Sequence, residues 1–386
     1  MNILRIQLYM KKSLLPPLFL FFLMNTLTAQ QRVEELPLNI GVMARGELNA
    51  ITDVDGVKVG HTTLVKGDSV RTGVTAILPH GGNIFQQKVP AAVFVGNGFG
   101  KLAGSTQINE LGNLETPVIL TNTLNVPTAM DAVIKYTLNL PGNENVRSVN
   151  AVAGETNDGY LNDIRGQHVT NEDVISAIEN AETGKVAEGN VGAGTGTIAF
   201  GYKGGIGTSS RKLPESLGGY TLGVLVQSNF GGVLQIAGVQ VGQKLGNYSF
   251  SNNLQNNVDG SCMVVVATDA PLNNRNLERL AKRAFLGLAK TGGIASNGSG
   301  DYVIAFSTAK GMRIPYKIET ETLKQEVVPN DLMSPLFMSA IEATEEAILN
   351  SLFMAETTTG FKDRTIKALP KEEVLQYLKE AGVLED

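Results

Sequence analysis

The stretch Asn256-Asn-Val-Asp-Gly-Ser-Cys-Met-Val-Val-Val-Ala-Thr-Asp-Ala-Pro-Leu272 runs from a polar loop directly into a continuous apolar segment. An uninterrupted run of this kind is typical of a β-strand that is buried on both faces. Taken alone, the Gly260-Ser261 pair in front of it also fits a simple turn before a strand. Two other places share the pattern: Ser296–Tyr302 leads into an apolar run, and Ser228-Asn229 ends one.

Three clusters of short polar side chains therefore lie at the ends of predicted strands. The chain has only three histidines, His61, His80 and His168, and they are scattered. Both facts favour chemistry by serine, aspartate and asparagine, with an amine as a further candidate group. No set of residues has the His, Cys or carboxylate spacing of a zinc site, and the glycine-rich stretch 189–198 lacks the lysine of a phosphate-binding loop. We therefore expect neither a metal nor a cofactor.

The rest of the pattern predicts a mixed α/β protein with buried sheets covered by helices. Further β-type runs lie at 56–64, 91–95, 117–121, 220–226 and 302–307. Four signals predict helices: a capping box at Thr170–Asp173, apolar residues at helical spacing from 277 to 288, Ser334 and Pro335 as N-cap and N1 of a helix to about Phe353, and Pro370 at the start of a last helix to about Ala381.

Composition excludes several classes of protein. Glycine supplies 43 of 386 residues without a Gly-X-Y period, which points to tight turns and close backbone approaches rather than collagen. The net charge is −5 and no basic stripe occurs, which argues against a nucleic-acid partner. Cys262 is the single cysteine, so no intramolecular disulfide can form, and we expect its side chain to fill the apolar face of its strand.

The first 29 residues have the pattern of an export signal. Three positive residues precede an apolar run at 13–24, and small residues up to Ala29 offer a cleavage site before Gln30; the positive residues are Arg5, Lys11 and Lys12. Met10 is an alternative start. A membrane anchor is the competing interpretation, but the run is too short to span comfortably. We expect an exported, periplasmic protein with no membrane span after the signal is removed.

The sequence resembles the L-aminopeptidase/D-esterase and β-peptidyl aminopeptidase family of self-cleaving serine hydrolases, peptidase family S58. The resemblance covers nearly all of the chain after residue 29. Besides Gly260-Ser261, the segments that carry it are 154–163, 205–211, 222–229, 264–272, 291–302 and 306–309.

This resemblance implies a precursor that cuts its own Gly260–Ser261 bond. Residues 30–260 and 261–386 would then be the α-chain and β-chain of one catalytic domain, with Ser261 as the amino-terminal nucleophile. The implied fold is a four-layer αββα sandwich like that of amino-terminal-nucleophile hydrolases, with different strand connectivity. The resemblance also implies a homotetramer.

The resemblance assigns roles to five further residues. Ser299 and Asp301 match the second serine and the acidic residue that are linked to the nucleophile; Asp301 is one methylene shorter than the glutamate of some members, which puts its reach to Ser299 in question. Asn229 matches the side-chain donor to the oxyanion. Glu155 matches the anchor of the substrate's free amino group, and Tyr160 matches an aromatic residue near the substrate.

The implied function is a serine aminopeptidase that releases amino-terminal residues from short peptides, amides and esters. Two alternatives stay open at this stage: an acyltransferase like the related ornithine acetyltransferases, which use threonine, and a non-catalytic periplasmic binding protein. The sequence does not distinguish a preference for α-L, D or β-amino residues.

Overall fold

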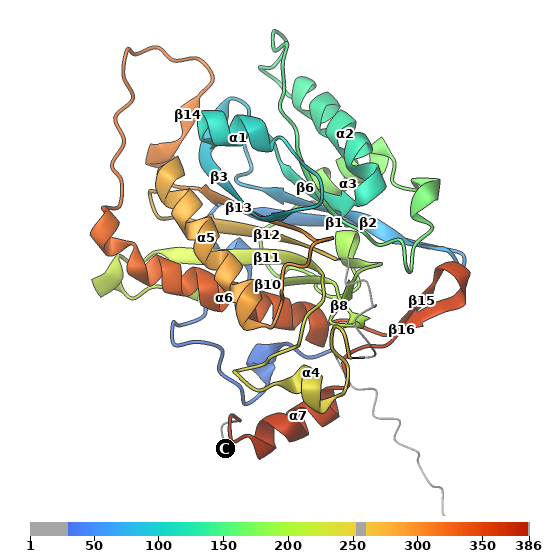
Figure 1. The fold of residues 1–386 in the computed structure, drawn as a ribbon. Helices are drawn as coiled ribbons and strands as arrows, with labels where there is room; N and C mark the ends of the chain where they lie inside the picture. The colour runs from blue at the N-terminus through green and yellow to red at the C-terminus, as the bar shows by residue number, and fades with distance from the viewer. Residues whose placement is uncertain (1–29, 252–259, 385–386) are drawn as a thin grey trace, which may run out of the picture.

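Two β-sheets packed face to face form the centre of the protein, in a computed structural model that describes residues 30–251 and 260–384 (Figure 1). The predicted export signal at 1–29 lies outside the described residues. The larger sheet has the strand order β10-β11-β12-β13-β3-β14, with β5 also paired to β3. Its strands are β10 (Ile206–Lys212), β11 (Thr221–Asn229), β12 (Ser261–Thr268), β13 (Gly300–Ser307), β3 (Gln87–Gly98), β14 (Ile314–Pro315) and β5 (Asn113–Leu114).

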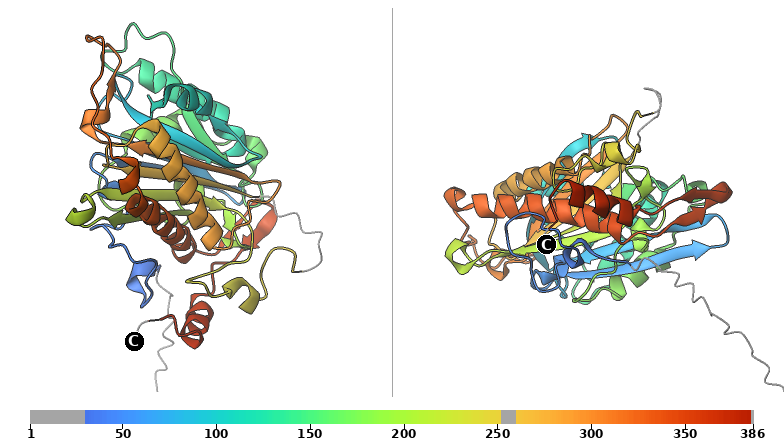
Figure 2. Two further views of the ribbon diagram at one scale, coloured as in Figure 1. Left: turned by 60° about the vertical axis from the view of Figure 1, so that its left-hand side comes forward. Right: turned by 90° about the horizontal axis from the view of Figure 1, so that it is seen from below.

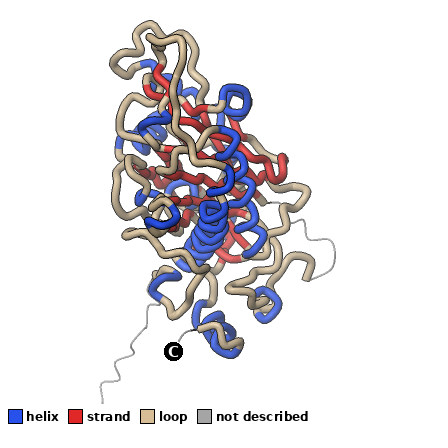
Figure 3. Tube along the Cα trace, turned by 90° about the vertical axis from the view of Figure 1, so that its left-hand side faces the viewer, coloured by secondary structure: helices blue, strands red, loops and turns tan. Residues whose placement is uncertain are grey.

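The smaller sheet has the order β1-β2-β6-β7-β4. Its strands are β1 (Lys58–Lys66), β2 (Val70–Leu78), β6 (Val118–Asn122), β7 (Val152–Thr156) and β4 (Leu102–Ala103). Helices α5 (Asn274–Lys290) and α6 (Ser334–Phe353) cover the outer face of the larger sheet, and α2 (Val126–Leu138) and α3 (Asn171–Glu179) cover that of the smaller one (Figures 1 and 2). The strands therefore lie between two helical layers (Figure 3), and the predicted αββα sandwich is confirmed.

Side chains point alternately to the two faces of β12, so this strand contributes to two hydrophobic cores. Cys262, Val264 and Val266 face the helices α5 and α6, whereas Met263 and Val265 pack between the sheets. Every residue of β12 is buried, as its continuous apolar sequence predicted. The Cys262 thiol is free and buried, as expected.

A glycine on β7 allows the two sheets to approach each other closely. A Cβ atom at Gly154 would lie 2.4 Å from Cε of Met263 on the facing strand β12, a distance at which atoms overlap. A larger residue at this position would therefore push β7 away from β12. This close approach of β12 to β7 lies one residue before Glu155.

The helices follow their sequence signals with one correction. The Thr170 hydroxyl accepts a hydrogen bond from Asp173 N and caps α3, and the apolar stripe of α5 is buried against the sheet. The last helix, α7 (Lys371–Glu380), begins after Pro370 as predicted. The prediction of Ser334 as the N-cap of α6 was wrong. Met333 is the N-cap and already has helical φ and ψ, because a 3₁₀ turn at Asn330–Leu332 leads into the helix.

Shorter elements complete the structure: α1 (Ser105–Leu111), α4 (Val241–Lys244), the pair β8 (Ile198–Ala199) and β9 (Tyr202–Lys203), and the hairpin β15 (Thr358–Gly360) and β16 (Arg364–Ile366), which projects at the right of Figure 1. Across 30–251 and 260–384, no helix has the length and apolar character needed to cross a membrane.

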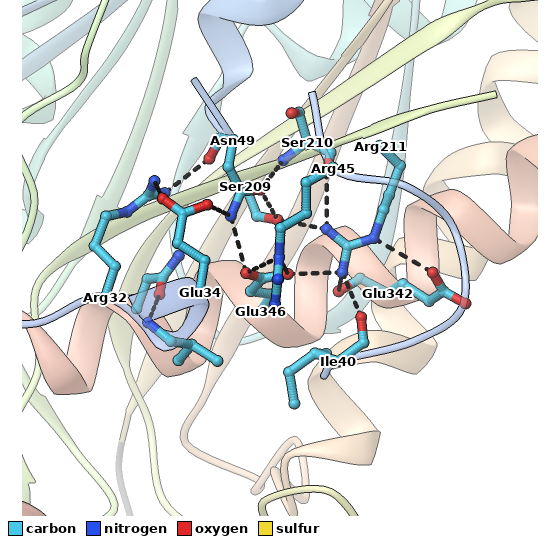
Figure 4. A network of polar contacts seen from close by, with 12 residues as sticks. Arg32, Glu34, Ile40, Arg45, Asn49, Ser209, Ser210, Arg211, Glu342 and Glu346 are labelled. Atoms are coloured by element: carbon cyan, nitrogen blue, oxygen red, sulfur yellow. Dashed lines mark hydrogen bonds and ion pairs between the residues drawn. The ribbon is translucent and has the colours of Figure 1, made fainter. Parts of the chain in front are cut away.

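A buried ionic network attaches the amino-terminal segment to α6 and β10 (Figure 4). Arg211 has no solvent exposure, and its guanidinium lies 2.7 Å from Oε2 of Glu346 and 3.3 Å from Oε2 of Glu342. The same guanidinium donates to Ile40 O at 2.6 Å, and Arg45 Nε lies 2.9 Å from Glu346 Oε1. The network therefore joins residues from three separate parts of the chain.

Replacing Arg211 by methionine should lower the free energy of unfolding by about 3–5 kcal/mol, because it leaves buried carboxylates without their main counter-charge. Urea denaturation followed by circular dichroism measures the loss. Lys135→Ala is the control, because Lys135 pairs with Asp131 on the surface of α2, where solvent screens the charges. Equal stability losses in both variants would contradict a special role for the buried network.

Candidate active site

A cavity of about 500 Å³ brings together residues of both sheets. Five of the predicted site residues line it: Glu155, Tyr160, Asn229, Gly260 and Ser261. The other described residues of the lining are Phe99, Lys101, Thr123, Asn157, Ile198, Phe200, Gly201, Phe230, Gly231, Asn247, Tyr248, Ser249 and Gly298. Its volume is that of a site for a small molecule.

Strand register brings the predicted nucleophile beside two groups that can donate hydrogen bonds. Ser261 is the first residue of β12; it stands opposite Asn229 on the antiparallel strand β11 and opposite Gly300 on the parallel strand β13. Its position in the alternation puts its side chain on the face of Met263, toward the other sheet. Ser261 is 5% exposed, so solvent reaches it only through the cavity.

The backbone amide of Gly300 contacts both sides of the Gly260–Ser261 bond. Gly300 N lies 3.2 Å from the carbonyl oxygen of Gly260 and 3.2 Å from Oγ of Ser261. One N–H group is thus shared by the carbonyl and by the hydroxyl that follows it. The peptide bond is held with both reacting groups next to the same donor.

Ser299 and Asp301 form their own pair beside this amide. Ser299 Oγ donates to Asp301 Oδ1 at 2.8 Å, so the shorter carboxylate does reach the serine. Asp301 on β13 pairs with Cys262 on β12, and the side chain of Cys262 faces the helices. Within the described residues, the hydrogen bond to Ser261 Oγ comes from Gly300 N rather than from this pair.

Burial changes the acidity of Asp301. It raises the pKa of the Asp301 carboxyl to about 6, while the Ser299 hydroxyl opposes the shift by stabilising the charged form. The group therefore changes charge close to neutral pH, which is the range where a carboxylate can exchange a proton during a reaction.

The amide of Asn229 is fixed by two backbone groups. Its Oδ1 accepts from Ile198 N at 2.9 Å, and its Nδ2 donates to Asn157 O at 3.1 Å. The first contact sets which end of the amide carries the hydrogens, since only the oxygen can accept. Nδ2 has two hydrogens, so a second one is available for a ligand in the cavity.

Glu155, near the end of β7, presents a buried carboxylate to the cavity. It is 3% exposed, its Oε1 accepts from Lys101 N at 3.0 Å, and its Oε2 accepts from the Thr123 hydroxyl. Burial raises the pKa of Glu155, and the contacts with Thr123 and Lys101 oppose this. Lys101 Nζ is 4.0 Å from Oε1 and half exposed, so the carboxylate is incompletely neutralised. Such a group favours a cationic ligand.

Aromatic side chains form much of the cavity wall. Tyr160 is half exposed at the cavity, with the Arg364 guanidinium 4.7 Å from its ring centroid. Phe200 and Phe230 form an edge-to-face pair with centroids 5.0 Å apart. Among the described residues, the lining thus combines the Glu155 carboxylate and the half-exposed Lys101 with apolar surface, and the buried carboxylate suits an amine that carries an organic side chain.

Several of these groups have no clear signal in the sequence. Nothing in a side-chain pattern identifies the Gly300 amide, because its role depends on backbone register. Thr123 and Lys101 are distant from Glu155 in sequence, and they reach it through the parallel pairing of β6 with β7 and the pairing of β4 with β7. Asn157 was within reach, since it lies in the Gly154–Asp163 segment already singled out.

Comparisons with known proteins identify relatives of this chain. The model of peptidase family S58 matches residues 49–366. The chain is 42% identical over 357 residues to the β-peptidyl aminopeptidase BapA of Sphingosinicella microcystinivorans, an alignment that covers 86% of this chain and 88% of that protein.

Solved structures give the same result. The PH0078 protein of Pyrococcus horikoshii OT3 matches with a TM-score of 0.84 and 49% identity, covering 91% of this chain and 100% of that one. The L-aminopeptidase D-Ala-esterase/amidase of Ochrobactrum anthropi, described as a variant of the Ntn hydrolase fold, matches with a TM-score of 0.84 and 37% identity, covering 92% of this chain and 99% of that one. On these grounds, the chain belongs to peptidase family S58.

Proposed function

We propose that this protein is a serine aminopeptidase that becomes active by cutting its own Gly260–Ser261 bond. The observation that carries the proposal is the position of the Ser261 hydroxyl, which shares the Gly300 amide with the carbonyl of Gly260 beside a cavity of substrate size. The relatives are aminopeptidases, so neither the acyltransferase nor the binding-protein alternative has support.

In the self-cleavage step, Ser261 Oγ attacks the carbonyl carbon of Gly260. An Oγ–C bond forms, the C–N bond breaks, and the hydroxyl proton ends on the nitrogen of Ser261. Negative charge develops on the Gly260 oxygen, which already accepts from Gly300 N at 3.2 Å. Water then hydrolyses the ester, restores the hydroxyl and leaves a carboxylate on Gly260.

The new α-amine of Ser261 can serve as the base in turnover, since an α-amine has a reference pKa of ~8. It accepts the proton of its own hydroxyl as Oγ attacks the substrate carbonyl. The free N–H of Asn229 stabilises the oxyanion, and the departing amine takes the proton. Hydrolysis of the resulting ester releases the amino-terminal residue of the substrate.

Glu155 binds the free ammonium group of the substrate, which sets the substrate class. Short peptides, amides and esters with an unblocked amino terminus fit a buried anion within the cavity.

The predicted signal at 1–29 supports export to the periplasm, and the family resemblance supports a homotetramer of two-chain protomers.

Intact-mass analysis of the purified protein should detect a chain of 126 residues that begins at Ser261. Ser261→Ala should give one uncut, inactive chain, because the attacking oxygen is gone. Ser307→Ala is the matched control. Ser307 is the last residue of β13, at the end away from Gly300, and its hydroxyl donates to Ala270 O. Hydrolysis of aminoacyl amides by an uncut wild-type chain would disprove activation by cleavage.

Asn229→Ala should lower kcat by about 10²–10³ and change KM much less, because it removes a donor that acts mainly in the transition state. Rates are expressed per cut chain, counted by mass spectrometry. Asn190→Ala is the control, since its amide contacts Glu356 and Thr358 outside the cavity. A change limited to KM would instead assign Asn229 to substrate binding.

Acetylation of the substrate amine should reduce kcat/KM by more than about tenfold, because a buried charge-assisted contact with Glu155 is lost. Alanine p-nitroanilide and its N-acetyl form measure this effect, and β-alanine p-nitroanilide tests the preferred backbone. Glu155→Gln should remove most of the discrimination, whereas Glu115→Gln, a buried acid outside the cavity, should retain it. Equal rates on free and acetylated substrates would rule out exopeptidase action.

A further inference from the structure

A fully buried lysine on the short strand β9 has no role in the reaction described above. Lys203, on β9, has no solvent exposure, and its Nζ donates to Gly194 O at 2.8 Å and to Gly204 O at 2.7 Å. Lysine is among the residues least often fully buried, because removing its charge from water is costly. The free energy lost by burying this ammonium group therefore needs a structural or functional reason.

Lys203 is connected to one of the two groups that hold Asn229. In the β8–β9 pair it stands directly opposite Ile198, whose N–H donates to Asn229 Oδ1. Gly204 N, the next amide along, donates to Thr197 O at 3.1 Å. The ammonium of Lys203 joins this short pair to the turn around Gly194, and so fixes the backbone that orients the Asn229 amide.

A buried aspartate is connected in the same way to the second group. Asp158 is 2% exposed, and it follows Asn157, whose carbonyl oxygen accepts from Asn229 Nδ2. Asn162 Nδ2 donates to Asp158 Oδ1 at 2.9 Å, which holds the carboxylate inside its own loop. Two backbone groups bind the side-chain amide of Asn229, and each therefore has a buried charged residue beside it. Lys203 stands opposite Ile198, and Asp158 follows Asn157.

The negative charge of Asp158 acts on the ammonium of Lys203. Burial lowers the pKa of the Lys203 ammonium to about 7, and the negative charge of Asp158 opposes that change. Burial likewise raises the pKa of the Asp158 carboxyl to about 7. The Asp158 carboxylate thus favours the charged form of Lys203, so its removal should make the buried ammonium less favourable.

We propose that Lys203 and Asp158 are positioning residues that together hold the amide of Asn229 in the orientation needed to stabilise the oxyanion. The proposal rests on the function proposed above, in which Asn229 is the donor. Neither residue lines the cavity, and both act through the backbone of Ile198 and Asn157. A displacement of about 1 Å at such a donor can cost on the order of 10² in rate.

The first test is Lys203→Met, which removes the charge but keeps an unbranched apolar side chain of similar length. We expect kcat per cut chain to fall by about tenfold or more, with KM for alanine p-nitroanilide within about twofold of wild type. Glu188→Gln is the matched control: Glu188 is another buried charged residue, and its polar contacts are with Arg32 and Thr208 rather than with Ile198 or Asn157. It should lose stability without losing kcat.

A double-mutant cycle separates positioning from a general structural effect. If Lys203 acts through Asn229, Lys203→Met should change kcat by less than about twofold in a chain that already carries Asn229→Ala. Effects that multiply, or a Lys203→Met enzyme with unchanged kcat, would overturn the proposal. Circular dichroism and thermal unfolding establish that each variant is folded.

Asp158→Asn is the second variant, and it tests the positioning proposal if Lys203→Met does not fold. It keeps the shape of the side chain and should show the same fall in kcat and the same lack of effect with Asn229→Ala. A multiplicative effect here would also overturn the proposal. Wild-type cleavage and turnover, measured alongside, distinguish this outcome from failure of the proposed function, in which the unmodified protein itself would be uncut or inactive.

Discussion

The register of three neighbouring strands is the constraint on which the candidate active site depends. Antiparallel pairing of β11 with β12 and parallel pairing of β12 with β13 put Asn229, Ser261 and Gly300 in one row across the larger sheet. A shift of β12 by a single residue would turn Ser261 toward the helices and present Cys262 to the cavity. The apolar side chains of β12 fill two separate cores in alternation, so such a shift would disrupt both. Packing far from the reacting atoms thus decides which side chain faces the substrate.

The second sheet contributes the complementary half of the site. Glu155 comes from β7, whereas the proposed nucleophile and the proposed donors come from β11, β12 and β13. The distance between the two halves is set by the spacing of the sheets, which is small here because Gly154 lets Met263 approach the backbone of β7. In the proposed reaction, the anion anchored on one layer and the hydroxyl anchored on the other would define a fixed separation between the amine of a substrate and the carbonyl that is attacked. The sandwich is therefore part of the site rather than only its support.

Much of the fold could be predicted from local patterns, because each apolar run or capping residue identifies its own element. The strands that begin at Ser261 and Gly300 and the helices α3, α5 and α7 were found in this way. The start of α6 was not, since the preceding 3₁₀ turn made a side-chain cap unnecessary. In the site, the side chains came from a family resemblance, whereas the Gly300 amide, Thr123 and Lys203 have no signal of their own. Their positions follow from pairings between distant segments, which a single sequence does not specify.

The proposed cut in front of β12 would change how the mature protein recovers from unfolding. Because β12 pairs with β11 on one side and with β13 on the other, the sheet and the core would keep the two polypeptides joined after the cut. Once they separate, however, β12 and β11 no longer belong to one molecule, and their reunion becomes a second-order reaction that competes with aggregation. In the uncut precursor the two strands stay in one molecule, so their pairing costs only the concentration-independent entropy of closing a loop. The lifetime of the mature protein is then governed by its rate of unfolding rather than by an equilibrium between two states.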